Sequence, residues 1–150
     1  MITESLLAFI IGLEGFSSCA YPDVSQYSNG FGTKALNRWE CITKAEAKSR
    51  MVKHLQEDSK FVLLLHPNAT QGEHDGLVSF CYNVGRAGCA KTVKLVAQNK
   101  KDAAAWVMKN KINKGTKAEA GHRKRRTLEI ALLNKKDEKK NFTCIYQEYS

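Results

Sequence analysis

The chain has 150 residues, 43% of them hydrophobic, which is the composition of a globular protein and argues against a disordered one. Its length suffices for one domain with its own core, and no apolar stretch is long enough to cross a membrane. The net charge of +9 is uneven, because residues 1–90 hold 8 basic against 9 acidic side chains and residues 91–150 hold 16 against 6.

The N-terminal segment predicts a helix over residues 3–14, because its apolar side chains recur with a helical period. Gly15 is a natural end for this helix, so Glu14 is expected at its C-terminus. The segment has neither a basic start nor a cleavage site of small residues. We therefore do not expect a signal peptide, and we expect the protein to stay in the cytoplasm of the cell that makes it.

Residues 16–42 favour β-structure. Pro22, Gly30 and Gly32 break helices, whereas the aromatic residues between them favour strands, so a small, irregular β-hairpin region is expected here. Residues 43–46 then form a capping-box pattern. A helix should run from there to about Leu65 and end before Pro67.

The rest of the chain predicts helices. A second capping-box pattern, Thr70 to Glu73, opens a helix that Gly85 closes. Shorter helices are expected near residues 91–98, 102–110 and 122–134, with a loop at 114–116, whereas the tail after Lys135 is assigned to no element. Strands confined to one place indicate an α+β fold, in which a small β-hairpin lobe packs beside a mostly helical lobe and the cleft between them is the natural ligand site.

The five cysteines lack the spacing of zinc ligands, and their odd number leaves at least one free thiol. Without an export signal we expect most of them to be reduced, and we expect that no disulfide is required for activity. Cys81 lies in an apolar run that suits the core. The four histidines also lack a ligand spacing, so we expect neither a metal nor another cofactor.

Glu14 and Asp23 are the candidate chemical pair. A carboxyl group at the end of an apolar helix is partly desolvated, which disfavours its charged form, whereas Asp23 lies in a polar turn that keeps it ionised. Acid-assisted cleavage of a glycosidic bond uses two carboxyl groups in such contrasting environments. The pair alone is a weak signal, because most Glu–Asp pairs at this spacing are structural.

The residues around this pair carry a resemblance. The sequence here resembles the active-site signature of the phage-type lysozymes, glycoside hydrolase family 24. The matching residues are Glu14-Gly15, then Tyr21-Pro22-Asp23, then Ser28 before Gly30-Phe31-Gly32. Residues 42–47 and 75–85 are similar to two helices of that family, and Gly121, Arg125, Arg126 and Glu129 match a further element. The resemblance covers roughly residues 3–133.

The resemblance implies a single lysozyme-like catalytic domain over residues 1–150, with a small lobe of about 15–69 and a helical lobe of 1–14 plus 70–150. It implies an endolysin that hydrolyses the β-1,4 bond between N-acetylmuramic acid and N-acetylglucosamine in bacterial peptidoglycan and so lyses the host cell. Glu14 would be the general acid. Asp23 would position or activate water, or stabilise the cationic transition state. Ser28 would hold the attacking water, and Lys34, Tyr82 and Thr92 would contact the substrate.

Ser28 departs from the family pattern in two ways. Ser28 replaces the usual Thr, and its distance from Asp23 along the chain is one residue shorter than is common, so its placement is open. Tyr82 suits core packing nearly as well as a sugar contact. Asp75, Arg125, Arg126 and Glu129 are interpreted as structural salt bridges and helix-end interactions.

Two other functions stay open. A lytic transglycosylase would also use one acid but would need no Asp23, and a non-catalytic cell-wall or nucleic-acid binding module would use the basic half. We expect peptidoglycan strands as the partner, no nucleic acid, no stable membrane insertion and a monomer. By analogy with relatives that lack a signal, the protein would wait in the host cytoplasm and act on periplasmic peptidoglycan after release.

Overall fold

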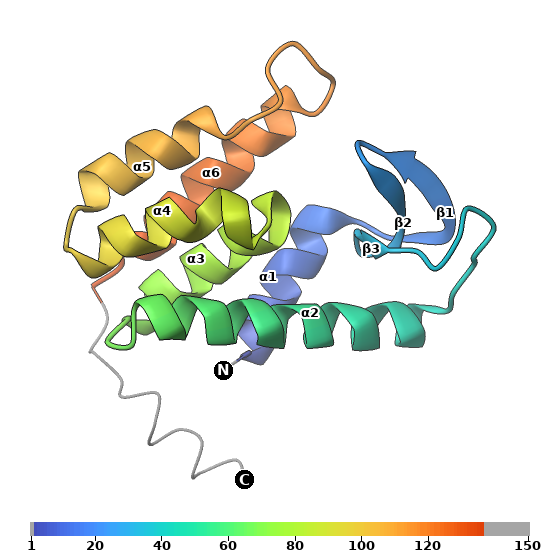
Figure 1. Cartoon of the computed structure of the whole chain (residues 1–150), viewed down its shortest axis with the longest axis horizontal. Coiled ribbons are helices and arrows are strands. Elements are labelled where there is room, and N and C mark those ends of the chain that lie inside the picture. Colours follow the sequence, from blue (N-terminus) through green and yellow to red (C-terminus); the bar gives the residue numbers. More distant parts are fainter. Residues whose placement is uncertain (1, 137–150) are drawn as a thin grey trace, which may run out of the picture. The chain divides into compact units, whose positions relative to one another are not determined.

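The computed structural model describes residues 2–136, and this part of the chain forms six helices and three strands (Figure 1). The strands all fall between residues 17 and 34, which confirms the predicted α+β class. None of the described helices is both long and apolar enough to span a membrane. In chain order the elements are α1 (Glu4–Glu14), β1 (Ser17–Asp23), β2 (Gln26–Gly30), β3 (Thr33–Lys34), α2 (Lys44–Leu65), α3 (Gln71–Val84), α4 (Arg86–Ala97), α5 (Lys101–Asn110) and α6 (Glu119–Leu133).

The chain folds as two compact units. The small unit, residues 2–57, holds α1, the three strands and the first part of α2. The large unit begins at Asp58 and holds the end of α2 and the helices α3 to α6. The lobes predicted from the sequence divide the chain differently, with residues 1–14 joined to 70–150, and that division stays a prediction.

Helix α1 begins and ends as its sequence predicts. The Thr3 hydroxyl accepts a hydrogen bond of 3.1 Å from the N–H of Leu6, which satisfies one of the amides left open at a helix start. Gly15 follows with a φ of +67°, a conformation that glycine adopts at little cost, and its N–H donates to the carbonyl of Ile11. Glu14 is therefore the last residue of the helix.

The three strands form an antiparallel sheet in the order β1-β2-β3. Asp23 and Gln26 are Cα partners, so only two residues make the turn between β1 and β2. At the other end of β2, Gly30 has a φ of +60°, and a Cβ there would come within 2.9 Å of the Cβ of Ala47 on α2. The absence of a side chain at Gly30 therefore lets the sheet rest directly on α2.

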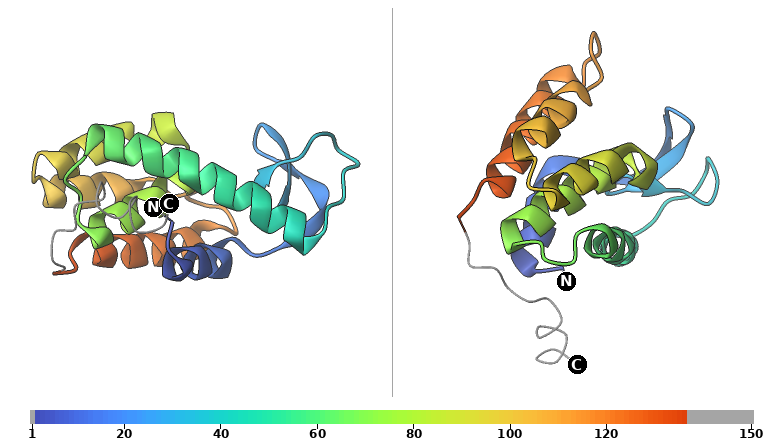
Figure 2. Two further views of the ribbon diagram at one scale, coloured as in Figure 1. Left: turned by 90° about the horizontal axis from the view of Figure 1, so that it is seen from below. Right: turned by 60° about the vertical axis from the view of Figure 1, so that its left-hand side comes forward.

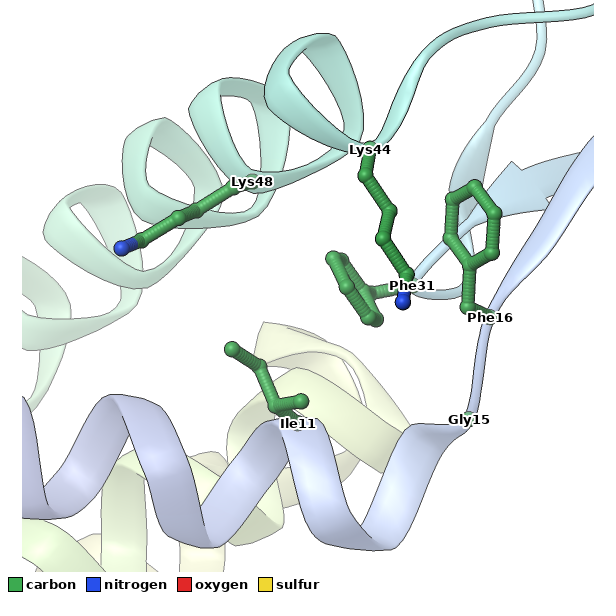
Figure 3. A pocket seen from close by; sticks show the side chains of 6 residues that line it. All are labelled: Ile11, Gly15, Phe16, Phe31, Lys44 and Lys48. Carbon is green, nitrogen blue, oxygen red and sulfur yellow. The ribbon is translucent and has the colours of Figure 1, made fainter.

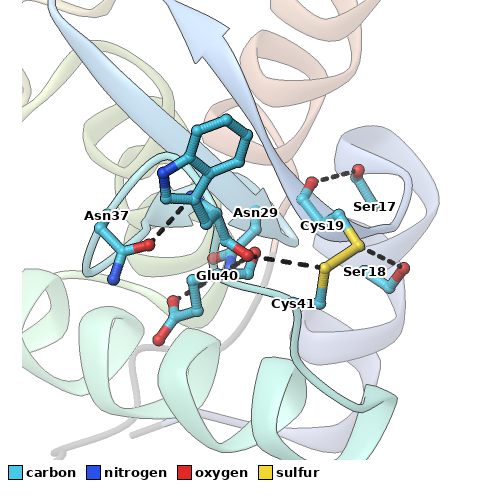
Figure 4. The surroundings of a disulfide bond; sticks show 8 residues. Ser17, Ser18, Cys19, Asn29, Asn37, Glu40 and Cys41 are labelled. Atoms are coloured by element: carbon cyan, nitrogen blue, oxygen red, sulfur yellow. Dashed lines mark hydrogen bonds between the residues drawn. A yellow bond between two sulfur atoms is a disulfide. The ribbon is translucent and has the colours of Figure 1, made fainter.

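The carboxylate of Glu40 joins several of these elements, and Figure 4 shows its contact with Asn29. Its Oε1 accepts hydrogen bonds from Asn29 Nδ2 at 3.0 Å, from the N–H of Leu36 at 3.2 Å and from Arg50 at 2.7 Å. The backbone carbonyl of Glu40 accepts from the N–H of Ala20 at 2.8 Å. The hydrogen bonds from Arg50 are the main cause that lowers the pKa of Glu40 to about 2.

Two disulfides form, Cys19–Cys41 in the small unit and Cys81–Cys89 in the large one. The expectation that most cysteines are reduced is therefore wrong for the structure, whereas the burial predicted for Cys81 is confirmed. Cys19 and Cys41 also form an isolated β-bridge, so their backbones are already adjacent. Cys81 and Cys89 lie on α3 and α4, which pack against each other. The fifth cysteine, Cys144, and the unassigned tail from residue 137 onward lie outside the described residues.

In the large unit, α3 packs against α4 and α6, and α5 packs against α4 and α6 (Figures 1 and 2). The predicted capping box of α3 is present, because Thr70 and Glu73 exchange two hydrogen bonds. Gly72 and Gly76 bring α3 close to α6, since a Cβ on either would approach backbone carbonyls of α6 within 2.3 and 2.7 Å. Such contacts exclude any larger residue at the two positions.

A buried ionic cluster fixes α6 in this unit. Glu129 accepts hydrogen bonds from Arg125 at 3.1 Å, from Arg126 at 2.6 Å and from the Ser79 hydroxyl at 2.6 Å. All four side chains are buried, so each charge has a charged or polar partner in place of water. Asp75 accepts from Gln71 and contacts His74, and the structural roles predicted for these charged residues are confirmed.

Two helix starts differ from the sequence-based prediction. Helix α4 begins at Arg86 and not near residue 91, because Gly85, with a φ of +83°, ends α3 and begins α4 without a spacer. Helix α6 begins at Glu119 and not near residue 122. Its N-cap, Ala118, makes no side-chain hydrogen bond, so no capping signal marks this start in the sequence.

The Glu40 cluster predicts a specific pH dependence of stability. Glu40→Gln removes the charge that Arg50 binds, so we expect a lower melting temperature at pH 7. Because the folded-state pKa is lowered from 4.5 to about 2, the ionic contribution is complete above pH 4.5 and is lost as the pH falls toward 2. The melting-temperature difference between parent and variant should shrink over that range.

The control for this prediction is Glu46→Gln. Glu46 contacts the same arginine at 3.1 Å, but its side chain is 52% exposed, so its removal should change the melting temperature much less. A parent-to-variant difference for Glu40→Gln that stayed constant down to pH 2 would contradict the ionic role.

The disulfides predict a response to reductant. The Cys19–Cys41 bond joins residues 22 positions apart, and in the chain-entropy account a loop of that length stabilises a fold by about 3 kcal/mol. Reduction should lower the melting temperature of the parent, and a Cys19→Ala/Cys41→Ala variant should show a smaller further decrease. Thermal unfolding with and without reductant measures this, with thiol titration to establish reduction. An unchanged melting temperature after complete reduction would contradict it.

Candidate active site

Glu14 lies at the junction of α1 and the sheet, close to the second glycine of the Gly30-Phe31-Gly32 turn. A Cβ on Gly32 would come within 3.1 Å of Glu14 Oε2, and Gly32 has a φ of +86°. Any other residue at position 32 would therefore crowd the carboxyl group of Glu14. Glu14 is half-buried, as its place at the end of an apolar helix predicts.

One face of the β1–β2 hairpin carries four polar side chains. Tyr21 and Asp23 alternate along β1, Gln26 and Ser28 alternate along β2, and Tyr21 with Ser28 and Asp23 with Gln26 are Cα partners. Because residues two apart and residues paired across a ladder project to the same side of a sheet, these four side chains share a face. The pairing thus collects them around Asp23.

Asp23 is held through both of its carboxylate oxygens. Its Oδ1 accepts from the N–H of Val24 at 2.8 Å, and its Oδ2 accepts from the Ser28 hydroxyl at 2.9 Å. The two-residue turn makes this contact possible, because it brings Ser28 back to Asp23 although the spacing between them is short. The placement of Ser28 that the sequence leaves open is thereby determined: it binds Asp23 and is fully buried.

Tyr21 is influenced by the charges of both Asp23 and Glu14. The pKa of Tyr21 is raised, first by partial burial and then by the negative charges of Asp23 and Glu14. A phenol that feels both charges lies within electrostatic range of both carboxyl groups. Both carboxyl groups lie in the small unit, Glu14 at the end of α1 and Asp23 at the end of β1.

Lys34 continues the same row onto the third strand. It is the Cα partner of Ser28, so Tyr21, Ser28 and Lys34 follow one another across β1, β2 and β3. Lys34 is exposed, which leaves its ammonium group accessible at the edge of the sheet. Its predicted contact with substrate stays a prediction.

Tyr82 and Thr92 belong to the large unit, on α3 and α4. Tyr82 is buried, and Thr92 is fully buried with no hydrogen-bond partner for its hydroxyl oxygen among the described residues. This burial agrees with the packing role left open for Tyr82. Their predicted contacts with sugar are not tested by the structure.

An apolar pocket of about 420 Å³ also lies in the small unit (Figure 3). Ile11 of α1 and the rings of Phe16 and Phe31 form its apolar surface, and two lysines of α2 complete it. Neither Glu14 nor Asp23 nor Ser28 lines this pocket. The pocket therefore does not include the candidate catalytic side chains predicted from the sequence.

Two polar residues beside the site were missed at the sequence level. Tyr21 was interpreted only as a strand former within a motif, and Gln26, whose Nε2 donates to the Ser28 hydroxyl at 3.0 Å, was not considered. Period-two alternation from Asp23 and Ser28 could have identified both, given a two-residue turn. Within residues 2–136, no three His, Cys, Asp or Glu side chains are grouped to hold a metal ion.

The small unit provides a half-buried carboxyl group at the end of α1 and a carboxylate on the sheet that is held in place by hydrogen bonds. These are the two groups that general acid–base catalysis requires. A hydroxyl group and an ammonium group flank them on the same face of the sheet.

Three solved structures share this fold, although their sequences are less than 25% identical to this chain. The muramidase domain of SpmX from Asticaccaulis excentricus has a TM-score of 0.77 at 23% identity, covering 91% of this chain and 99% of that one. The endolysin from Escherichia coli O157:H7 phage FAHEc1 has a TM-score of 0.72 at 24% identity, covering 93% and 97%. A mutant of P22 lysozyme has a TM-score of 0.68 at 20% identity, covering 90% and 99%.

A search of curated proteins by sequence found no significant match. The sequence model of the family described as phage lysozyme, in contrast, matches residues 12–129. That range includes Glu14, Asp23 and Ser28, together with the Arg125, Arg126 and Glu129 cluster. The fold is thus lysozyme-like, and the chain belongs to the phage lysozyme family.

Proposed function

We propose that this protein is an endolysin that hydrolyses the β-1,4 bond between N-acetylmuramic acid and N-acetylglucosamine in bacterial peptidoglycan and thereby lyses the host cell. Membership of the phage lysozyme family supports a peptidoglycan-cleaving lysozyme. The observation that carries the proposal is the pairing of a carboxyl group held against Gly32 with a second carboxylate held by Ser28.

In this mechanism Glu14 is the general acid. It donates a proton to the glycosidic oxygen as the bond to the anomeric carbon breaks, which is the step that water at neutral pH performs worst. Its half-buried position at the end of α1, beside Gly32, supports this role.

Asp23 serves as the anion of the pair. It either takes a proton from the attacking water or stabilises the positive charge on the sugar. Asp23 itself is exposed, so water can reach its remaining lone pairs. Lys34, Tyr82 and Thr92 are proposed to contact the glycan strand.

A lytic transglycosylase is the second candidate enzyme. It would leave a 1,6-anhydro sugar and would need no base for water, so the hydrogen-bonded Asp23 favours hydrolysis. A non-catalytic cell-wall module is the remaining candidate, and the acid–base pair counts against it. Analysis of the cleaved ends of purified peptidoglycan distinguishes the three, because hydrolysis alone yields reducing N-acetylmuramic acid.

We further propose that the protein resides in the host cytoplasm until release and acts as a monomer on periplasmic peptidoglycan, without nucleic acid and without stable membrane insertion. The two disulfides support action in an oxidising compartment, where such bonds persist.

Glu14→Gln should abolish the release of reducing sugar while leaving the melting temperature nearly unchanged. The amide keeps the shape of the side chain but has no acidic proton, and general acid catalysis accelerates such reactions by about 10²–10⁴-fold. Asp23→Asn should also be severely impaired, whereas Asp23→Glu should retain more activity because it still presents an anion. A folded Glu14→Gln protein that worked at the parent rate would falsify the mechanism.

Ser28→Ala should lower the rate by about 10-fold, because it removes the hydroxyl that donates to Asp23, a charged acceptor. Ser28→Thr keeps that hydroxyl, at the cost of placing a methyl group in a fully buried position, and should retain more activity than Ser28→Ala. Reducing-sugar release per folded enzyme, with the melting temperature as folding control, compares the two. Equal activity of Ser28→Ala and parent would exclude a role for the hydroxyl.

A further inference from the structure

Gln26 lies on β2, as Ser28 does, and contacts the hydroxyl group that binds Asp23. Gln26 Nε2 lies 3.0 Å from Ser28 Oγ, and Ser28 Oγ lies 2.9 Å from Asp23 Oδ2. Gln26 is also the Cα partner of Asp23, directly across the two-residue turn. The three side chains therefore form a short hydrogen-bonded chain on one face of the hairpin.

The direction of each hydrogen bond follows from the chemistry of the hydroxyl group. A serine hydroxyl has one hydrogen and two lone pairs. The charged Asp23 carboxylate is the stronger acceptor, so it receives the one hydrogen. Ser28 Oγ can then meet Gln26 only through a lone pair, which requires that the amide N–H of Gln26 face it. Gln26 is thus the donor to Ser28. Because the Gln26 amide occupies a lone pair of the hydroxyl oxygen, the hydroxyl hydrogen of Ser28 points to Asp23.

The burial of Ser28 strengthens the effect of these two hydrogen bonds. Ser28 is fully buried, so bulk water does not reach its hydroxyl group. The hydroxyl group has protein partners on both sides, whereas Asp23 is exposed. Ser28 therefore orients Asp23 in this chain, and the attacking water is left to the exposed side of the carboxylate.

We propose that Gln26 is a positioning residue that acts through Ser28 to fix the carboxylate of Asp23. This inference rests on the proposed glycosidase function. With Asp23 as the base, the water oxygen bonds to the anomeric carbon, Asp23 takes a water proton, and the leaving oxygen keeps the electron pair of the broken bond and takes the proton of Glu14. Gln26 touches none of the reacting atoms.

The test measures kcat and KM on soluble peptidoglycan strands for Gln26→Met, which has similar length and no donor. Loss of one neutral hydrogen bond should lower kcat by about 3- to 10-fold, with KM changed less than two-fold. In a Ser28→Ala background the same substitution should have no further effect, because its target is absent. Ser25→Ala, an exposed position in the same turn, is the matched control and should equal the parent.

Gln26→Glu gives a second, isosteric variant. Its carboxylate can only accept a hydrogen bond, so at pH 7 it competes with Asp23 for the Ser28 hydrogen and should lower kcat more than Gln26→Met does. When the pH falls and this carboxylate is protonated, it can donate again, so the ratio of its rate to that of the parent should rise. In the Ser28→Ala background this pH-dependent recovery should disappear.

The possible failures are distinguishable. If the parent and Ser25→Ala release no reducing sugar, or Glu14→Gln works at their rate, the proposed function fails. If the parent is active and Glu14→Gln is not, but both Gln26 variants fold and match the parent, the positioning role is overturned. Equal effects of Gln26→Met with and without Ser28 would also overturn it, since they would show that Gln26 does not act through Ser28.

Discussion

The hydrogen bonds to the carboxylate of Glu40 determine which way the second strand faces. Glu40 binds Arg50 of α2 on one side and the amide of Asn29 on β2 on the other. Because side chains alternate along a strand, fixing Asn29 toward Glu40 places Ser28 on the opposite face, where Asp23 and Tyr21 lie. The geometry of the candidate active site thus depends on an ion pair that takes no part in the chemistry.

Two glycines in that strand region set how closely the sheet approaches its neighbours. Gly30 allows the sheet to pack closely against Ala47 of α2, and Gly32 leaves room for the carboxyl group of Glu14. A Cβ would collide at Gly30 and would crowd the carboxyl group of Glu14 at Gly32, and each glycine adopts a positive φ. The helix that carries the acid and the sheet that carries Asp23 can therefore be close without an intervening side chain. In the large unit, Gly72 and Gly76 perform the same function between α3 and α6.

Much of this could be predicted from the sequence, because local signals were strong. The apolar period and Gly15 located the end of α1 at Glu14, and Thr70 with Glu73 located the start of α3. The signals failed where an element depends on distant contacts. Cys81 and Cys89 pair across the Gly85 junction between α3 and α4, and no local pattern marks that pairing. Gln26 lies opposite Asp23 only because the turn between β1 and β2 has two residues, and the sequence does not determine that length.

The two-residue turn between β1 and β2 also has a consequence for how this hairpin tolerates insertions and deletions. An extra residue at Val24 or Ser25 would lengthen the loop and leave every side chain of β2 on its present face. The same residue inserted between Gln26 and Ser28 would reverse the faces of the residues on one side of it, so that either Gln26, or Ser28 and Asn29 together, would leave their present faces. Length variation among homologous hairpins is therefore expected to concentrate in the turn, and a sequence alignment that places a gap inside the strand would misassign the hydroxyl residue.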